Sequence, residues 1–221
     1  MLENLIVPVL NRYDLLQRML SSIDYPINHV VIIDNGSAYR DHTPHLTMPE
    51  NIVQVTYLPM PSNLGVAESW NLGIKLLPHD RRWFIVSNDV WFDPGTIEKF
   101  ENTPDDVFGK AANAPSWHTF IIPDNIVHTV GLFDSNLYPA YFEDNDYERR
   151  MAHHGFTPQP IAHVNHENSS TIKSDPELNR HNNETFQRNR KYYDQKMANN
   201  DITAGVYNLQ TRRANEWLRN R

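Results

Sequence analysis

A dense group of side chains that could do chemistry lies in residues 142–150, which read FEDNDYERR. Glu143, Asp144 and Asp146 place three carboxylates within four positions, where their charges repel one another. Such a group either faces water, binds a cation, or acts as an acid or base in a reaction. An acidic helix N-terminus, which the helix dipole favours, also explains the charge. It does not explain the aromatic residues that precede the cluster, which are Tyr138, Tyr141 and Phe142.

A second candidate is a metal site around Asp89. This residue follows the apolar run Trp83–Val86, and a carboxylate just beyond a buried strand is costly unless it is exposed, hydrogen-bonded or bound to a metal. His163 and His166 stand three positions apart and could complete an oxygen-rich site that Asp89 begins. Because the chain has no cysteine, these ligands favour Mn²⁺ or Mg²⁺ over a structural zinc. An ordinary strand-end cap is the alternative interpretation of Asp89.

A third candidate is a nucleotide pocket. Asp34 ends the apolar run His29–Asp34, where its carboxylate could accept hydrogen bonds from a base N–H or a ribose hydroxyl. A ligand-free Asp-Asn-Gly turn fits the same residues. The first predicted turn, Pro8–Asp14, contains no glycine, which excludes a dinucleotide fingerprint and a P-loop. A bound nucleotide diphosphate would therefore need a divalent cation at its phosphates.

Parallel strands would bring these candidates together. Short apolar runs predict four strands, and amphipathic stretches predict two helices between them. The predicted strands are Asn4–Leu10, His29–Asp34, Ile52–Leu58 and Trp83–Val86, and the predicted helices are Leu15–Ile23 and Val66–Leu77. This β-α-β-β-α-β order predicts an α/β fold with a mainly parallel sheet covered on both faces. Ligands gather at the carboxyl ends of the strands in such sheets, where we expect Asn11, Arg12, Asp34, Asn35, Asn88 and Asp89.

The rest of the chain predicts shorter and more polar elements. The middle has helical turns at Pro94–Phe100 and strands at Val107–Ala112 and Trp117–Ile122, and helices follow at Asp144–His153, Glu184–Met197 and Ala204–Leu218. Residues 156–183 are polar and rich in His and Asn. Asp146 and Arg150 stand four positions apart and could pair on a helix.

Composition narrows the class of protein. The chain has 221 residues, 11% of them aromatic, which is enough for one domain with a buried core. The absence of cysteine excludes disulfides, thiolate metal sites and cysteine nucleophiles, and it fits a reducing, cytoplasmic location. No apolar run approaches the ~18 residues that a transmembrane helix needs. The first residues predict a strand and not a signal peptide.

Charge is distributed unevenly along the chain. Residues 1–147 hold 8 basic and 19 acidic residues, a balance of −11, whereas residues 148–221 hold 12 basic and 8 acidic residues, a balance of +4. A solvated tail is one interpretation of this asymmetry. The other is a tail that contacts an anionic partner, such as nucleic acid, an acidic glycan or lipid head groups.

Five segments, in order, resemble family-2 glycosyltransferases of the GT-A fold, in particular the rhamnosyltransferase-like branch. They are LIVPVLNRYDLLQRMLSSI, VVIIDNGS, NLGVAESWNLGIK, FIVSNDVWFDPGTI and VGLFDSNLYPAYFEDNDYERRMAHHGF. The resemblance implies a GT-A domain over residues 1–171, with a mostly parallel Rossmann-like sheet flanked by helices. Its nucleotide-binding half would cover about residues 1–92 and its acceptor half about 93–171, and a helical extension would follow over 172–221.

The resemblance implies a role for each matching residue. Asp144 would be the general base that deprotonates the acceptor hydroxyl, with Glu143 beside it. Asp89 would bind the metal that bridges the donor diphosphate, with His166, or else His163, as the later ligand. The donor pocket would be lined by Pro8, Asn11, Arg12, Asp34, Asn63, Gly65, Asn71 and Asn88.

These roles imply an inverting enzyme that depends on Mn²⁺ or Mg²⁺. It would move a hexosyl or pentosyl group from a nucleotide-diphosphate sugar to a hydroxyl of a glycan, a small molecule or modified DNA. The Gln-x-x-Arg-Trp motif of processive relatives is absent, which predicts single transfers. No membrane-associating helix is expected, and assembly into a homo-oligomer is compatible with the sequence.

Other functions remain open at this point. A phage-type enzyme that glycosylates a hydroxymethylated base in DNA keeps the chemistry and changes the acceptor. A nucleotidyltransferase would need a glycine-rich opening, which is missing. A non-catalytic protein that binds carbohydrate or a nucleotide sugar is favoured by Ser87, which stands where the family often has a carboxylate. Glu143, Asp144 and His166 oppose that last alternative.

Overall fold

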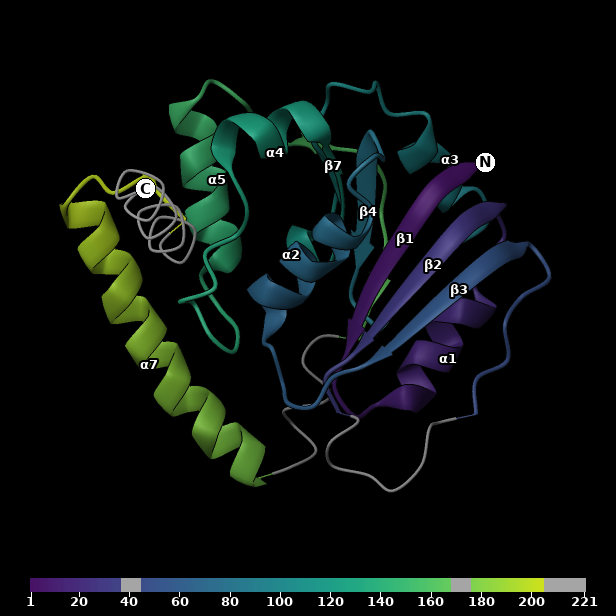
Figure 1. Ribbon diagram of the computed structural model, residues 1–221, viewed down its shortest axis with the longest axis horizontal. Coiled ribbons are helices and arrows are strands. Elements are labelled where there is room, and N and C mark those ends of the chain that lie inside the picture. The colour runs from purple at the N-terminus through teal and green to yellow at the C-terminus, as the bar shows by residue number, and fades with distance from the viewer. Residues whose placement is uncertain (37–44, 168–175, 205–221) are drawn as a thin grey trace, which may run out of the picture.

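The computed structural model describes residues 1–36, 45–167 and 176–204. Its first elements are β1 (Leu2–Val9), α1 (Tyr13–Ser21), β2 (Ile27–Asp34), β3 (Ile52–Pro59), α2 (Val66–Leu76) and β4 (Arg82–Val86). The predicted β-α-β-β-α-β order is therefore confirmed. Strand β1 pairs in parallel with β2 and β4, and β2 pairs in parallel with β3. The carboxyl ends of all four strands consequently lie at one edge of the sheet (Figure 1).

Shorter elements complete the sheet. They are β5 (Val90–Trp91), α3 (Thr96–Glu101), β6 (Gly109–Lys110), the 3₁₀ turn η2 (Ser116–His118), β7 (Thr119–Pro123), α4 (Asp124–Val130), α5 (Glu143–His153), β8 (Gln159–Pro160), β9 (Asn165–His166) and α7 (Pro176–Ala198). Over the described ranges, the strands form one sheet in the order β3-β2-β1-β4-β7-β6-β8 and a separate β5-β9 ribbon. Strand β7 runs antiparallel to β4 and β6, so the sheet is mostly but not wholly parallel.

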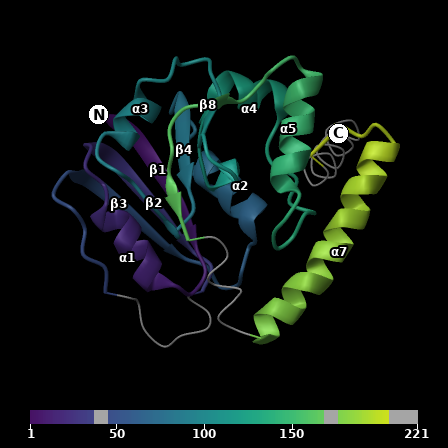
Figure 2. The ribbon, with the colours of Figure 1, turned by 180° about the vertical axis from the view of Figure 1, so that it is seen from behind.

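Helices cover both faces of the sheet, as its apolar strands predict. Alternate residues of β1 face opposite ways: Leu5 and Val7 pack in the core under α1, and Ile6 packs in the core under α2. Helices α1 and α3 lie on one face, and α2, α4 and α5 lie on the other (Figures 1 and 2). Gly73 allows α2 to approach β1 closely, because a Cβ there would lie 2.4 Å from Ile6 Cγ2.

A buried asparagine joins β1 to the start of β4. Asn4 Nδ2 donates to the Arg82 carbonyl (2.7 Å) and to Asp80 Oδ2 (2.7 Å), and Asn4 Oδ1 accepts the Phe84 amide (3.1 Å). Its amide group thus satisfies backbone groups that the short pairing between β1 and β4 leaves over. These hydrogen bonds fix the position of β4 relative to β1, and so the position of the turn after β4 that carries Asp89.

The predicted boundary of the C-terminal helix is wrong. Helix α7 begins at Pro176, well before the expected start at Glu184. Proline suits the first position of a helix, and the residues from Pro176 to Asn183 read PELNRHNN, which has no apolar repeat from which a helix could be predicted. The helix expected at 204–218 lies almost wholly outside the described residues.

In the part of the chain that is described, no helix combines the length and apolarity needed to cross a membrane.

The middle of the chain also differs from expectation. The stretch Trp117–Ile122, predicted as a strand, starts as the turn η2 and becomes β7 only at Thr119, because Trp117 turns inward to pack against Phe108 and Phe120. The predicted strand Val107–Ala112 shrinks to β6, which has two residues. Helix α4 and the β5-β9 ribbon were not predicted, since both are too short to produce a period.

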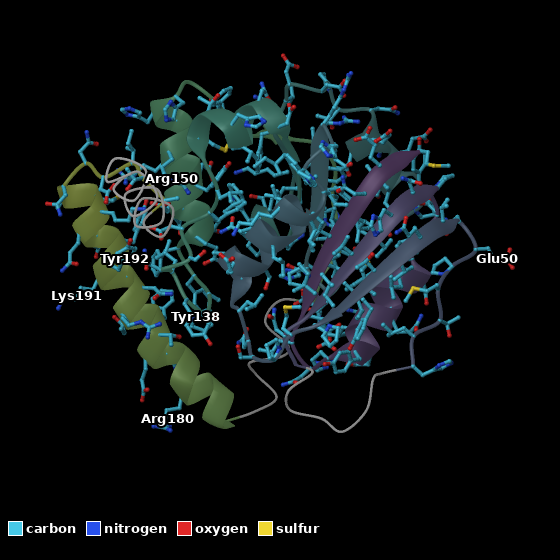
Figure 3. All side chains as sticks on the ribbon, in the orientation of Figure 1. Glu50, Tyr138, Arg150, Arg180, Lys191 and Tyr192 are labelled. Atoms are coloured by element: carbon cyan, nitrogen blue, oxygen red, sulfur yellow. The ribbon has the colours of Figure 1, made fainter. Side chains whose placement is uncertain are left out.

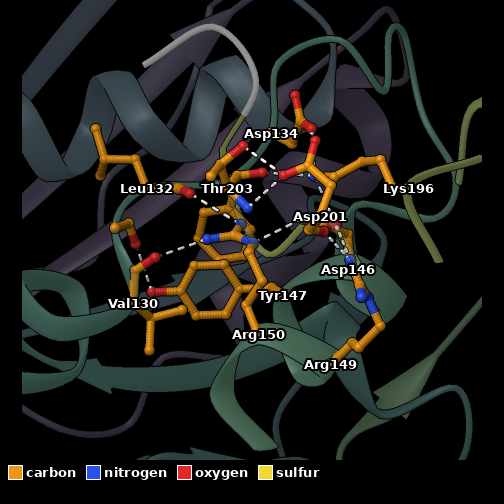
Figure 4. Close-up of polar contacts among 12 residues, drawn as sticks. Val130, Leu132, Asp134, Asp146, Tyr147, Arg149, Arg150, Lys196, Asp201 and Thr203 are labelled. Atoms are coloured by element: carbon orange, nitrogen blue, oxygen red, sulfur yellow. Dashed lines mark hydrogen bonds and ion pairs between the residues drawn. The ribbon is translucent and has the colours of Figure 1, made fainter. Parts of the chain in front are cut away.

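A buried ionic group lies beneath the C-terminal helix, and we call it the Lys196 cluster: Asp134, Asp146, Arg150, Tyr192 and Lys196. Lys196 Nζ lies 2.6 Å from Asp134 Oδ2 and 2.8 Å from Asp146 Oδ1 (Figure 4). Arg150 Nε lies 2.8 Å from Asp146 Oδ2, which confirms the predicted helical pair. The Tyr192 hydroxyl donates to Asp134 Oδ2 at 3.0 Å.

The charges of this cluster balance one another away from water. Burial on its own would raise the pKa of Asp134, but the charge and hydrogen bond of Lys196, together with hydrogen bonds from the Asn136 amide and the Tyr192 hydroxyl, outweigh burial and hold that pKa below its usual value. The stabilisation is therefore present above the unfolded-state pKa of about 3.9, and it is lost as the pH falls through the lower folded-state pKa. Arg150 also donates to the carbonyls of Val130 and Leu132, both at 2.9 Å, and so closes the end of α4.

Replacing Lys196 by methionine should leave two buried carboxylates without their cation. Removal of one partner from a buried ion pair typically costs about 3–5 kcal/mol, and we expect Lys196→Met to lower the free energy of unfolding in urea by that amount. Arg180→Ala is the control, because Arg180 and Glu184 form an exposed pair on α7, and Arg180 points away from the body of the molecule (Figure 3). It should cost less than about 1 kcal/mol. Equal losses in the two variants would contradict the role of the cluster.

Candidate active site

Asp34 lies at the carboxyl edge of the sheet but is fully buried. Its Oδ1 accepts the Tyr13 hydroxyl (2.7 Å) and the Gly36 amide (3.0 Å), and its Oδ2 accepts the Tyr57 hydroxyl. The side chain is thus oriented by two tyrosines and by the Asp-Asn-Gly turn that follows β2. That it reads the nucleobase stays a prediction.

The turn after β1 carries the next predicted donor residues. Asn11 is exposed and has a φ of 62°, a left-handed conformation that asparagine tolerates better than most residues. Arg12 forms a two-point contact with Asp14, at 2.9 and 2.7 Å. Asn88 Nδ2 donates to the Arg12 carbonyl at 3.3 Å, which joins the turn after β4 to the turn after β1. Pro8 lies within β1, in register with β2.

Asp89 and His166 meet, as the resemblance implied. Asp89 Oδ1 lies 3.1 Å from His166 Nε2, and the β5-β9 ribbon holds the two residues together by pairing Val90 with His166. The His118 ring stacks on His166, with ring centroids 4.5 Å apart. Burial, followed by the neighbouring His166, lowers the pKa of His118 to about 4, so this imidazole is neutral at pH 7.

His118 was not identified from the sequence. It stands alone in a stretch predicted as a strand, and no motif marks it. Its Nε2 is buried and has no hydrogen-bond partner among the described residues, whereas its Nδ1 contacts Thr119 Oγ1 at 3.1 Å. The Ser87 amide donates to the His118 carbonyl at 2.7 Å, so β4 and the turn η2 are tied together beside the Asp89–His166 pair.

The Asp89–His166 pair offers two of the ligand atoms that a divalent cation shared with a substrate would use. Among the described residues, no group of three His, Asp or Glu side chains is arranged to hold a metal. His163 is exposed, and its role as a ligand stays a prediction. Mg²⁺ usually binds through one or two protein ligands together with substrate phosphates and water. Asp89 Oδ1 and His166 Nε2 are the atoms that would hold Mg²⁺ or Mn²⁺ here.

Glu143, Asp144 and Asp146 lie in the first turn of α5, but their side chains have different surroundings. Glu143 is buried, and no described residue partners its Oε2. Burial and the nearby Asp144 raise the pKa of Glu143 to about 8, so it is largely protonated at pH 7. Burial also raises the pKa of Asp144, although the Asn145 amide donates to its Oδ1 at 2.8 Å. Asp146 is committed to the Lys196 cluster.

A series of hydrogen bonds connects the carboxyl edge of the sheet to α5. The Asn35 amide donates to the Val9 carbonyl (2.8 Å), and Asn35 Oδ1 accepts the Leu64 amide (3.0 Å). At the start of α2, the Val66 amide then donates to the Pro139 carbonyl (2.7 Å), in the loop that leads into α5. The predicted nucleotide side and the predicted acceptor side are therefore in direct contact at this edge.

Three predicted donor residues shape this junction. Asn63 Oδ1 accepts the Gly65 amide at 2.8 Å. Asn71 is buried, its Nδ2 donates to the Phe133 carbonyl (2.9 Å), and its Oδ1 accepts the Phe133 amide (2.9 Å). Asn71 thus holds the acceptor side of the fold against α2. Contact of these residues with a nucleotide stays a prediction.

The sequence profile described as Glycosyl transferase family 2 matches residues 4–157, which is most of the chain. The chain belongs to glycosyltransferase family 2. The mostly parallel sheet flanked by helices is the GT-A arrangement that the resemblance implied. The matched residues of this family-2 chain include β1 to α5 and hence Asp34, Asp89 and Asp144, whereas β9 and α7 lie beyond the match.

One curated relative of the family-2 chain is a galactofuranosyl glycosyltransferase of Leishmania donovani, 34% identical over 103 residues. The matched part covers 45% of this chain and 23% of that protein, so this chain spans about a quarter of the relative's length. Among solved structures, TarS 1-349 of S. aureus has a TM-score of 0.46 at 16% identity, covering 68% of this chain and 55% of that one. A second TarS structure has a TM-score of 0.47 at 16% identity, covering 68% and 33%.

Gly65 should be the least replaceable glycine at the junction. Its φ of 79° and ψ of 173° are accessible almost only to glycine, and a Cβ there would lie 2.8 Å from the Pro139 carbonyl oxygen. We expect Gly65→Ala to lower the free energy of unfolding by about 2–4 kcal/mol, from backbone strain and overpacking together.

Gly95→Ala is the comparison variant, with a positive φ but no close contact within the described ranges. Gly95 also has a positive φ, of 77°, but a Cβ at this position would have no other part of the described chain within 4 Å. This variant should lose only about 1 kcal/mol, the typical cost of a left-handed residue. Urea unfolding of both variants measures the difference, and a loss at Gly65 no larger than that at Gly95 would show that the contact with Pro139 is unimportant.

Proposed function

We propose that this chain is an inverting, metal-dependent glycosyltransferase that moves a sugar from a nucleotide-diphosphate donor to an acceptor hydroxyl. The observation that supports it most is the convergence at one edge of the sheet. The Asp89–His166 pair lies just after β4, and the Val66–Pro139 hydrogen bond brings the loop before Asp144 to the same edge. In the proposed enzyme, the cation site and the base would lie near this edge, one on the donor side and the other on the acceptor side.

The donor side would neutralise the leaving group. When bound at Asp89 and His166, a divalent cation would offset the negative charge that develops on the departing diphosphate. The chain has no glycine-rich turn for this purpose, and the turn after β1 offers Arg12 instead. Arg12 is already paired with Asp14, so its guanidinium is held in place before a donor arrives.

The acceptor side would supply the base. As the acceptor oxygen bonds to the anomeric carbon, the bond from that carbon to the diphosphate oxygen breaks, and Asp144 takes the proton of the hydroxyl. Attack from the face opposite the leaving group inverts the anomeric centre. The raised pKa of Asp144 improves its strength as a base. Glu143, protonated at pH 7, is suited to donate a hydrogen bond and not to accept a proton.

The acceptor class is narrowed by the contacts of α7. Arg188 donates to the Tyr138 carbonyl, and Arg190 pairs with Asp194 and lies over the Phe142 ring. These contacts explain part of the basic character of residues 148–221 without an anionic partner, and the DNA acceptor loses support. We favour a hydroxyl of a glycan or small molecule as the acceptor.

A panel of donors tests the proposal. UDP-glucose, UDP-galactofuranose, GDP-mannose and dTDP-rhamnose would each be added to the chain with and without Mn²⁺, and melting temperature and donor hydrolysis would be measured. A donor at 100 times its Kd should stabilise the fold by about 2.7 kcal/mol. Mn²⁺-dependent stabilisation together with hydrolysis supports an enzyme. Stabilisation without hydrolysis or transfer would instead indicate the non-catalytic alternative.

Asp89→Asn should weaken the binding of nucleotide and Mn²⁺ together. The amide keeps the shape of the side chain but loses the negative charge that a divalent cation needs, so calorimetry should show at least a tenfold rise in the Kd for UDP with Mn²⁺ and little change without the metal. Asp106→Asn, at an exposed site after α3, is the matched control and should bind normally. A folded Asp89→Asn chain with unchanged affinities would refute the metal assignment.

Asp144→Asn should abolish most turnover and spare donor binding. Loss of a general base typically costs ~10²–10⁴-fold in rate. Glu143→Gln is the informative comparison: its amide resembles the protonated carboxyl group that is already present at pH 7, and kcat should stay within about tenfold of the wild-type value. Steady-state kinetics and donor calorimetry on both variants measure this. If Glu143→Gln were the more damaging change, the roles of the two residues would be reversed.

A further inference from the structure

Helix α7 lies outside the family match, yet it packs against the loop that leads into the acidic turn of α5. Figures 1 and 2 show it running along the outer side of α5, far from the sheet. Its inward residues recur at helical spacing, with the outward ones exposed, such as Gln187, Lys191 and Gln195. In Figure 3, Lys191 points away from the body of the molecule.

Two polar side chains of α7 hold the backbone of this loop. Asn189 is buried, with 1% of its surface exposed, and its Nδ2 donates to the Ala140 carbonyl at 2.8 Å. Arg188 donates to the Tyr138 carbonyl. Both bonds are made to main-chain oxygens, so they fix the path of the chain between residues 138 and 140 whatever side chains the loop carries.

Aromatic contacts hold the next two residues. The Phe186 ring packs against Tyr141 and Phe142, with ring centroids 5.2 and 5.1 Å apart. The Tyr193 ring stacks on Phe142 at 5.6 Å. Phe142 is therefore enclosed by two aromatic residues of α7, which lie about two helical turns apart.

The residues held in this way have a strained backbone. Tyr141 has a φ of 80° and Phe142 a φ of 72°, left-handed values that are rare for bulky residues and persist only when the surroundings impose them. Phe142 immediately precedes Glu143 and Asp144. Its carbonyl also accepts the Asp146 amide at 2.9 Å, which is the first backbone hydrogen bond of α5.

We propose that α7 is a positioning element for catalysis: by holding Tyr141 and Phe142 in the left-handed conformation, it sets the direction of the first turn of α5 and so the place of the Asp144 carboxylate. This inference rests on the proposed function, in which Asp144 is the base. Asn189 and Phe186 are positioning residues, because they act on Asp144 through the loop and have no assigned contact with substrate.

Asn189→Leu tests the proposal, since it removes the hydrogen bond to Ala140 and keeps a side chain of similar size. Phe186→Leu is a milder second variant that keeps an apolar contact, and Gln187→Ala on the exposed side of α7 is the matched control. For each folded variant, three quantities are measured: kcat with the donor that the wild type turns over, the Kd of UDP with Mn²⁺, and the hydrogen-exchange rate of the Asp146 amide. The His154 amide, at the other end of α5, is the internal reference.

We expect Asn189→Leu and Phe186→Leu to lower kcat at least tenfold, to leave the Kd of UDP within twofold, and to speed exchange of the Asp146 amide but not of the His154 amide. Gln187→Ala should change none of these. Unchanged kcat in folded variants would overturn the proposal, whether or not exchange is faster. If the wild type turns over no donor, the proposed function fails on its own. In that case an unchanged exchange rate of the Asp146 amide in Asn189→Leu and Phe186→Leu would overturn the placement of α5 by α7. Faster exchange in these variants would uphold that placement.

Discussion

A single ammonium group, Lys196 Nζ, lies between the carboxylates of Asp134 and Asp146, and the acceptor half of the molecule depends on that placement. Both carboxylates are fully buried and could not remain charged there without a cation. Asp134 belongs to the segment after α4, Asp146 to α5 and Lys196 to α7. One charge therefore fixes three segments that have no shared strand pairing, and Arg150 extends the same arrangement to the end of α4.

The two halves of the fold are held together by two physically different kinds of contact, apolar packing and directional hydrogen bonds. The sheet of the nucleotide half is held by apolar residues that alternate between two cores, an arrangement that is strong but not directional. The second of these cores also contains Phe120, Phe133 and Tyr147 of the acceptor half. Asn71 adds a directional contact between the halves, because its side-chain amide pairs with the backbone of Phe133. Hydrogen bonds have preferred lengths and angles, so the spacing between the donor side and the base is set by polar contacts and not by packing alone.

The contrast between apolar packing and hydrogen bonds explains which features the sequence could predict. The strands of the nucleotide half are continuous apolar runs because both of their faces are buried, and their order and carboxyl edge were predicted correctly. Asp144 and Asp146 look alike in the sequence, yet two positions on a helix differ by about 200°, so one joins the buried cluster and the other does not. Residue types suggested either His163 or His166 as the partner of Asp89, and only the resemblance favoured His166. His118 and the contacts of α7 had no signal, since a lone histidine and bonds to main-chain carbonyls leave no pattern.

The Lys196 cluster also bears on how far the folding unit extends. The family match ends at residue 157, but Lys196, the cation that balances Asp134 and Asp146, belongs to α7. Lys196 Nζ also donates to the Thr203 carbonyl at 2.6 Å, and Thr203 follows α7 in the sequence. A fragment cut at the end of the match would carry one buried arginine opposite two buried carboxylates, with the aromatic side of residues 141–142 bare to water. The part of the chain that matches the family profile is thus smaller than the part whose buried charges are balanced together, and a domain boundary drawn from that match alone would divide this charge cluster.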